Sequence, residues 1–160
     1  AVVRDGRPVA AVLAEPEADR IFVAALGHGA TVRGRRAVAS ARDSFDGARL
    51  AGPRPMIEPA GRQGAILLPK VHSLALRLAK VAIGEVDAAF ASANSSDWDL
   101  AAADLLVHEA GAILTSLDGA QVLYNQAQPV HGALIAAAQP LHSLLRDLGR
   151  GPRLRPSSKP

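Results

Sequence analysis

Short apolar runs alternate with turn-forming residues along the first forty positions. The apolar runs cover residues 8–14, 20–26 and 30–32. The acidic, proline-containing segment 15–19 separates the first two runs, and Gly27-His28-Gly29, which can adopt positive φ, separates the second and third. This spacing predicts a meander of antiparallel strands joined by hairpin turns. The chain opens at Ala1-Val2-Val3 as if inside a strand, so we expect an upstream segment.

Residues 41–64 contain three prolines and four glycines and have no clear apolar period. Both residue types interrupt regular structure. This segment is therefore predicted to be an irregular connection between two structural layers.

The pattern changes after Gly64. Apolar positions recur at steps of three and four residues in three segments, and continuous apolar runs lie between them. The predicted helices are 73–83, 97–110 and 141–148, and the predicted strands are 65–68, 86–91, 112–115 and 132–137. The alternation predicts an α/β protein, built as a layered α+β sandwich. We expect the end of an antiparallel-sheet domain at 1–48, an α/β domain at 49–149 and a disordered tail at 150–160.

Composition narrows the possible functions. Hydrophobic residues make up 49% of the chain and aromatic residues only 3%, and there is no cysteine, which excludes disulfides and thiolate chemistry. The net charge of +3 is basic, but the scarcity of aromatic residues argues against nucleic-acid binding. No apolar run is long enough to cross a membrane. We therefore predict a cytoplasmic protein with neither a nucleic-acid nor a membrane partner.

The densest group of polar residues is Asp97-Trp98-Asp99, at the start of the helix predicted at 97–110. A carboxylate at this position can cap the helix by accepting free backbone N–H groups. It can also serve as a rigid oxygen ligand for Mg²⁺. The residues alone leave both interpretations open.

Trp98-Asp99 followed by Leu100 and the alanines 101–103, and then the segment 106–111, resembles the second signature of the inositol monophosphatase superfamily. Residues 33–40, 73–84 and 132–137 resemble further segments of that family in the same order. The resemblance implies an inositol-monophosphatase-like sugar phosphatase fold, truncated at its N-terminus. It also implies Mg²⁺-dependent hydrolysis of a small phosphorylated substrate, in which the metals polarise the phosphoryl group and activate a bound water. The full-length protein is expected to be a homodimer.

The resemblance assigns roles to individual residues. Asp99 becomes a metal ligand, with Asp97 and Trp98 beside it and not touching the metal. Ser73, Lys70 and His72 become candidate substrate-binding residues. The alternative roles are those of helix caps, for Asp97 as well as for Ser73.

The family's other metal ligands lie in a Glu-Glu pair and an Asp-Pro-x-Asp-Gly-Thr motif, and this motif does not occur in the sequence. The chain is therefore expected to be inactive alone. For the parent protein we predict a 3′(2′),5′-bisphosphate nucleotidase, because the chain is basic and Ser92 stands seven residues before Asp99, where inositol-specific members carry a Glu. The segment 71–75 lacks the nucleotidase lysine, so an inositol-1-monophosphatase is the first alternative. A non-catalytic binding relic of the fold is the second.

Other polar residues are predicted to be structural. Asp104 lies roughly 140° from Asp99 around the helix and is interpreted as a solvated or hydrogen-bonded residue. Glu109 is interpreted as a structural residue near the helix end. Four isolated histidines are predicted to lie on the surface or in turns: His28, His108, His131 and His142.

Overall fold

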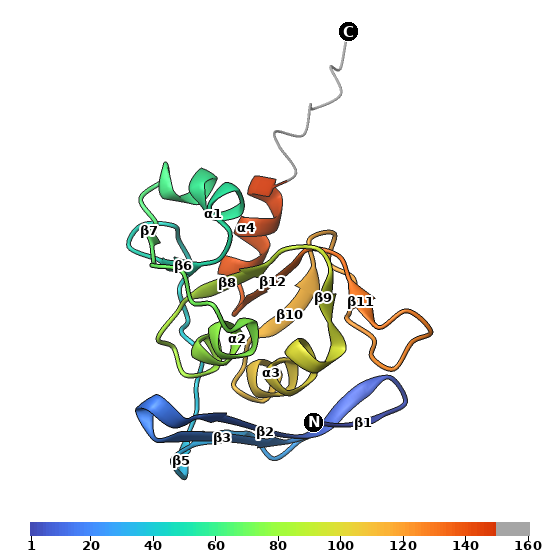
Figure 1. Cartoon of the computed structure of the whole chain (residues 1–160). Helices are drawn as coiled ribbons and strands as arrows, with labels where there is room; N and C mark the ends of the chain where they lie inside the picture. The colour runs from blue at the N-terminus through green and yellow to red at the C-terminus, as the bar shows by residue number, and fades with distance from the viewer. Residues whose placement is uncertain (150–160) are drawn as a thin grey trace, which may run out of the picture.

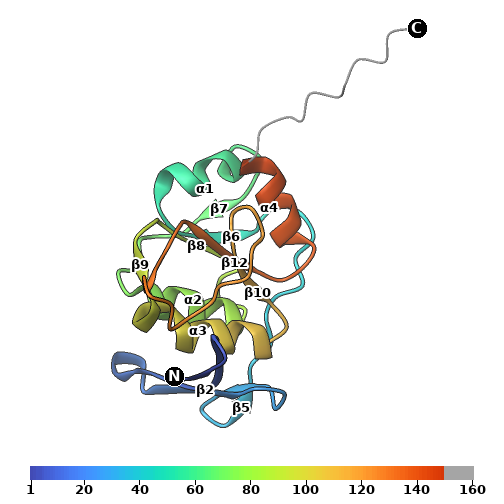
Figure 2. The same cartoon turned by 90° about the vertical axis from the view of Figure 1, so that its right-hand side faces the viewer.

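The structure is a computed structural model and describes residues 1–149; the tail predicted to be disordered lies outside this range. The described chain forms four layers (Figures 1 and 2). An antiparallel sheet lies at one side, helices α2 and α3 pack on it, a mixed sheet covers these helices, and α1 and α4 pack on the far face of that sheet. This arrangement agrees with the predicted layered sandwich of helices and sheets.

The first sheet confirms the predicted meander. Its strands are β1 (Val2–Arg4), β2 (Arg7–Glu15), β3 (Arg20–Ala25), β4 (Ala30–Val32) and β5 (Arg35–Arg36). They are antiparallel and adjacent in chain order. A 3-10 turn over Pro16–Ala18 joins β2 to β3. Phe22 and Ala24 of β3 face inward and are fully or almost fully buried against the helices.

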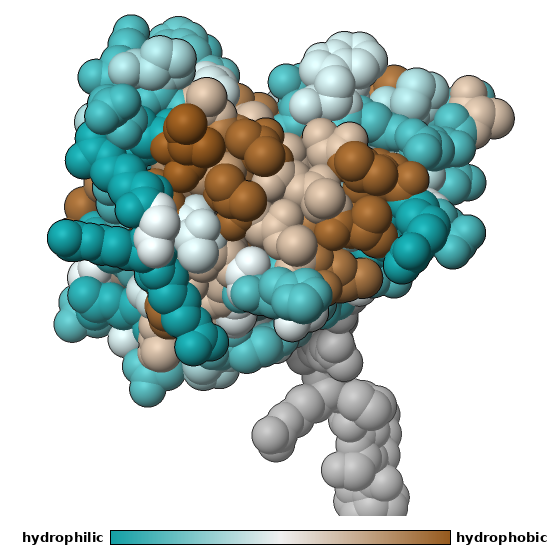
Figure 3. All heavy atoms as spheres, turned by 90° about the horizontal axis from the view of Figure 1, so that it is seen from below, coloured by the Kyte–Doolittle hydropathy of each residue, from teal (hydrophilic) through white to brown (hydrophobic). Residues whose placement is uncertain are grey.

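The outer face of this sheet is also apolar. Val2, Val12, Ile21 and Val23 are between 43% and 62% exposed. Val12 is paired directly with Val23, so these side chains stand together on one face. Figure 3 shows the apolar patch that results, seen from below.

The second sheet has the order β10-β12-β8-β6-β7. Its strands are β6 (Arg49–Ala51), β7 (Ile66–Leu67), β8 (Ala88–Ala91), β10 (Ile113–Ser116) and β12 (Leu134–Ala137). β8 and β12 are buried along their whole length, as expected for strands covered on both faces. A separate pair, β9 (Ser95–Ser96) and β11 (Val130–His131), was not predicted, because two residues are too few to show a period.

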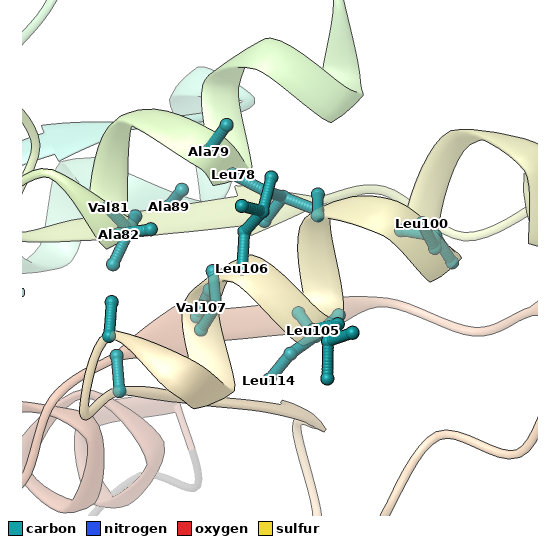
Figure 4. Close-up of a cluster of buried hydrophobic side chains, with 14 of the residues drawn as sticks. Leu78, Ala79, Val81, Ala82, Ala89, Leu100, Leu105, Leu106, Val107 and Leu114 are labelled. Carbon is teal, nitrogen blue, oxygen red and sulfur yellow. The ribbon is translucent and has the colours of Figure 1, made fainter. Parts of the chain in front are cut away.

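Helices α2 (Leu74–Ala82) and α3 (Asp97–Glu109) form the central layer, as predicted. Leu78, Leu100, Leu106 and Val107 are completely buried, and Figure 4 shows them within the core. Because most side chains in this layer are Ala, Val or Leu, the helices lie close to both sheets.

The prediction that residues 41–64 are irregular is wrong in part. The segment contains β6 and an eight-residue helix, α1 (Arg54–Gly61), which packs against α4 (Leu141–Gly149). Pro55 lies in the first turn, where a missing N–H costs nothing. Pro59 lies inside the helix, yet Ile57 and Ala60 are buried. Burial of these side chains offsets the hydrogen bond that proline cannot make.

The prediction for His142 is also wrong. Its side chain is completely buried, and its Nε2 atom lies 3.0 Å from the hydroxyl of Thr115. Burial lowers the pKa of His142 to about 4, so the imidazole is neutral in the folded protein at neutral pH. It is therefore part of the core. His28 and His108 are exposed, as predicted.

Candidate metal and substrate site

Helix α3 begins one residue earlier than a cap at Asp97 requires. Ser96 is the N-cap and makes no side-chain capping bond, and Asp97 is the first helical residue. The two carboxylate oxygens of Asp97 accept hydrogen bonds from the backbone N–H of Asn125 at 2.8 Å and from Nε2 of His131 at 2.6 Å. Asp97 therefore holds the segment 125–131 against α3 and is not the N-cap of that helix. His131 is a partner of this carboxylate and not an isolated surface histidine.

Asp104 is buried in the middle of α3, with 1% of its surface exposed. One of its oxygens accepts hydrogen bonds from Nη1 of Arg7 and from the hydroxyl of Tyr124, both at 3.0 Å. Burial raises the pKa of Asp104, although the nearby Arg7 acts in the opposite direction. This residue is hydrogen-bonded, as predicted, and it links α3 to the first sheet.

Glu109, the last residue of α3, accepts two hydrogen bonds from another segment. Its two carboxylate oxygens accept the backbone N–H groups of Gly27 and Gly29, at 2.8 and 2.7 Å. Both glycines have positive φ in the β3–β4 turn. Glu109 therefore has the structural role that was predicted for it.

Asp99 differs from these three residues. It is half-buried in the first turn of α3, and within residues 1–149 its carboxylate makes no hydrogen bond and no ion pair. The next residue, Leu100, is completely buried, as is Val107. Asp99 lines neither the hollow beside α2 nor the one between α1 and α4.

The described residues do not form a complete metal site. Mg²⁺ requires octahedral oxygen coordination and gives up its waters reluctantly, so one carboxylate does not hold it. Between residues 1 and 149 no group of three or more His, Asp or Glu side chains could hold a metal ion. Asp99 fits the role of a single oxygen ligand, because its carboxylate is half-buried and has no partner within residues 1–149.

Trp98, beside Asp99, is 77% exposed. An exposed indole carries a large apolar surface, which favours contact with a ligand or another protein segment. That Trp98 lies beside a metal ligand stays a prediction.

Ser73, Lys70 and His72 lie together at the start of α2. The hydroxyl of Ser73 accepts the backbone N–H of Leu76 at 3.2 Å, so Ser73 is a helix cap, the alternative considered for it. Lys70 and His72 are exposed and line a hollow of about 690 Å³, which Ser92 also borders. The structure therefore places two of the three predicted substrate residues at one cavity.

The sequence interpretation missed Arg77, which is buried and also lines this hollow. The periodicity contained a signal for it. Arg77 lies about 60° from Leu74 around the helix, at the flank of the apolar stripe that faces the core. A charged residue at the border of a buried face is a candidate for a functional role.

In the described part of the chain, no helix is long and apolar enough to span a bilayer.

Comparisons with known proteins support the resemblance. The model of the inositol monophosphatase family matches residues 1–149. Nus factor SuhB of Pseudomonas aeruginosa is 31% identical over 156 residues, which cover 84% of this chain and 56% of that protein. Inositol-1-monophosphatase of Mesorhizobium japonicum is 30% identical over 144 residues, with 82% and 53% covered. The chain thus spans about half the length of the curated relatives it matches.

The fold is similar as well. The structure of inositol monophosphatase from Anabaena (Nostoc) sp. PCC 7120 matches with a TM-score of 0.79 and 25% sequence identity, over 92% of this chain and 63% of that one. The predicted fold class is therefore confirmed. The match over residues 1–149, together with the shared fold, shows that this chain belongs to the inositol monophosphatase family.

Proposed function

We propose that this chain supplies one metal-ligating carboxylate, Asp99, to a Mg²⁺-dependent phosphatase that hydrolyses a small phosphate monoester. The observation that carries the proposal is the contrast along α3. Three of its four acidic side chains hold another segment of the protein, and Asp99 holds none within residues 1–149. A half-buried carboxylate without a partner is suited to an external cation, because its negative charge is not neutralised within the fold.

The remaining ligands have to come from residues outside the printed sequence. Residues 1–149 contain no cluster that binds a metal, and the chain covers about half of its curated relatives. We therefore expect phosphatase activity from the whole protein that carries this chain, and none from the 160 residues alone. A cytoplasmic location and a homodimer are part of the same proposal.

For the substrate we propose a 3′(2′),5′-bisphosphate nucleotide. The support is the charge of the hollow beside α2, which Arg54, Lys70 and Arg77 line together with His72. A substrate with two phosphates carries more negative charge than a single monoester and suits such a cavity. The alternative, inositol 1-phosphate, is supported by the similarity to the inositol-1-monophosphatase of Mesorhizobium japonicum.

A second candidate function is a non-catalytic binding or interaction domain that keeps the fold without the metals. The incomplete ligand set within residues 1–149 supports it, and so does the name Nus factor carried by the relative from Pseudomonas aeruginosa. The two candidates differ in whether the whole protein releases phosphate at all.

Phosphate release by the whole protein separates these possibilities. We expect hydrolysis of adenosine 3′,5′-bisphosphate with Mg²⁺ present and none after chelation with EDTA, since the metal must stabilise the developing charge. Inositol 1-phosphate serves as the competing substrate in the same assay. Preference for inositol 1-phosphate would replace the nucleotide assignment with the alternative. Absence of hydrolysis of either compound would support the non-catalytic domain.

A further inference from the structure

Arg77 is a buried cation that has no carboxylate partner among the described residues. Only 9% of its surface is exposed, and its Nε atom is buried and makes no hydrogen bond in the described part of the chain. Within residues 1–149 its guanidinium donates one hydrogen bond, a long one, from Nη1 to the carbonyl of Val71 at 3.3 Å. Burial lowers the pKa of Arg77, which reflects the cost of placing an unpaired charge out of water. Such a cost normally persists only where another group compensates for it.

The fold pairs three other partly buried arginines with carboxylates, and Arg146 donates to the backbone carbonyls of Leu117 and Asp118. Arg7 lies 3.0 Å from Asp104, Arg20 lies 2.5 Å from Glu15, and Arg49 lies 3.0 Å from Asp87. Hydrogen bonds from Arg49 hold the pKa of Asp87 below its usual range in spite of the burial of that carboxyl. The chain therefore supplies carboxylates to these arginines. The lack of one at Arg77 sets it apart from them.

The hollow around Arg77 is cationic throughout. Arg54, Lys70 and His72 line it with Arg77, and no aspartate or glutamate does. None of these four side chains forms an ion pair with a residue in the range 1–149. Arg54 is the first residue of α1, and His72 lies just before the cap of α2, so the positive ends of two helices border the cavity.

We propose that this hollow binds a second phosphate group of the substrate, with Arg77 as the buried hydrogen-bond donor and Lys70 as an exposed charge. That the bound phosphate belongs to a substrate rests on the proposed function, whereas the binding of an anion in this hollow does not. A phosphate supplies the missing acceptor for Nε and the missing negative charge together, and arginine is suited to bind it through two parallel bonds. The volume of about 690 Å³ lies within the range of small-molecule sites.

The hollow is linked to Asp99 along the chain through Ser92. Ser92 lines it and directly follows β8, and the chain then runs through β9 into the first turn of α3. Seven residues therefore separate a lining residue from Asp99. A substrate with phosphates at both ends would place one group at Arg77 while the other meets the metal ligand.

The direct test uses the whole protein in EDTA, titrated with inorganic phosphate and followed by backbone amide NMR shifts. We expect saturable shifts at Gly52, His72 and Arg77. Arg77→Met, which keeps a buried side chain of similar length, should weaken this binding by about tenfold or more, as expected for the loss of a charge-assisted bond. Arg36→Met, in exposed strand β5, is the matched control and should bind as the wild type does.

A second variant and a kinetic comparison complete the test. If Arg77→Met does not fold, Lys70→Gln at the exposed rim should still weaken phosphate binding, by about threefold. In Mg²⁺, Arg77→Met should lower kcat/KM for adenosine 3′,5′-bisphosphate relative to adenosine 3′-phosphate. Absence of shifts at the hollow, or unchanged binding by a folded Arg77→Met protein, would overturn the inference. Phosphate binding without any hydrolysis would contradict the proposed function and leave the anion site standing.

Discussion

The acidic residues of helix α3 fall into two groups: three hold another segment of the protein, and one has no partner within residues 1–149. Near its middle and its end, Asp104 binds Arg7 and Tyr124, and Glu109 binds the turn after β3. At its start, Asp97 binds Asn125 and His131 of β11, but Asp99, two residues further on, binds nothing in residues 1–149. One helix therefore carries three structural acids and a single free one.

The same distinction holds for the arginines. Arg7 and Arg49 face carboxylates and hold segments of the fold together, whereas Arg77 is buried beside a hollow without an acidic residue. A fold gains stability from a buried charge only when that charge is paired. Unpaired charges at partly or fully buried positions are consequently the best candidates for binding an external ion or ligand.

The largest effect on stability is expected at Asp104. Asp104→Ala leaves the guanidinium of Arg7 and the hydroxyl of Tyr124 without their acceptor, so the free energy of unfolding should fall by about 3 kcal/mol. Urea denaturation of the whole protein measures this change. Asp99→Ala is the matched control in the same helix and should change stability by less than about 1 kcal/mol. Equal losses in the two variants would remove the distinction between paired and free acids.

A smaller effect is expected at Glu109. Glu109→Ala removes two hydrogen bonds to the backbone of the β3–β4 turn, but this turn is partly exposed and water can replace the carboxylate. The free energy of unfolding should therefore fall by about 1 to 2 kcal/mol. Amide exchange at Gly27 and Gly29 should become faster while exchange in β8 does not change. Glu17→Ala, at an exposed position in the 3-10 turn, should have no such effect.

Much of this fold could be predicted from apolar periodicity. Strands β2 to β4 and helices α2 to α4 lie within a few residues of the predicted ranges, because each buries a regular stripe of side chains. Helix α1 was missed because its prolines conceal the burial of Ile57 and Ala60. The pair β9 and β11 was missed because each strand depends on a partner more than thirty residues away along the chain.

The candidate site could be predicted only in part. The carboxylate of Asp99 at a helix start follows from local sequence, and so does the cap formed by Ser73. The partners of Asp97, His131 and Asp104 depend on contacts between distant segments, which no local pattern contains. Arg77 was overlooked because its lack of a partner becomes visible only when all surrounding side chains are in place.

The central claim is that Asp99 is the free carboxylate that binds the metal. Its most direct test compares the Mg²⁺-dependent turnover of Asp99→Asn with that of the wild type, in the whole protein and with the melting temperature of each recorded. Asparagine keeps the size of the side chain and its ability to accept hydrogen bonds at a helix start, so the melting temperature should hardly change. Turnover should fall by about a thousandfold or more, because a charge that balances the metal is lost. Near wild-type turnover in a folded Asp99→Asn protein would contradict this account.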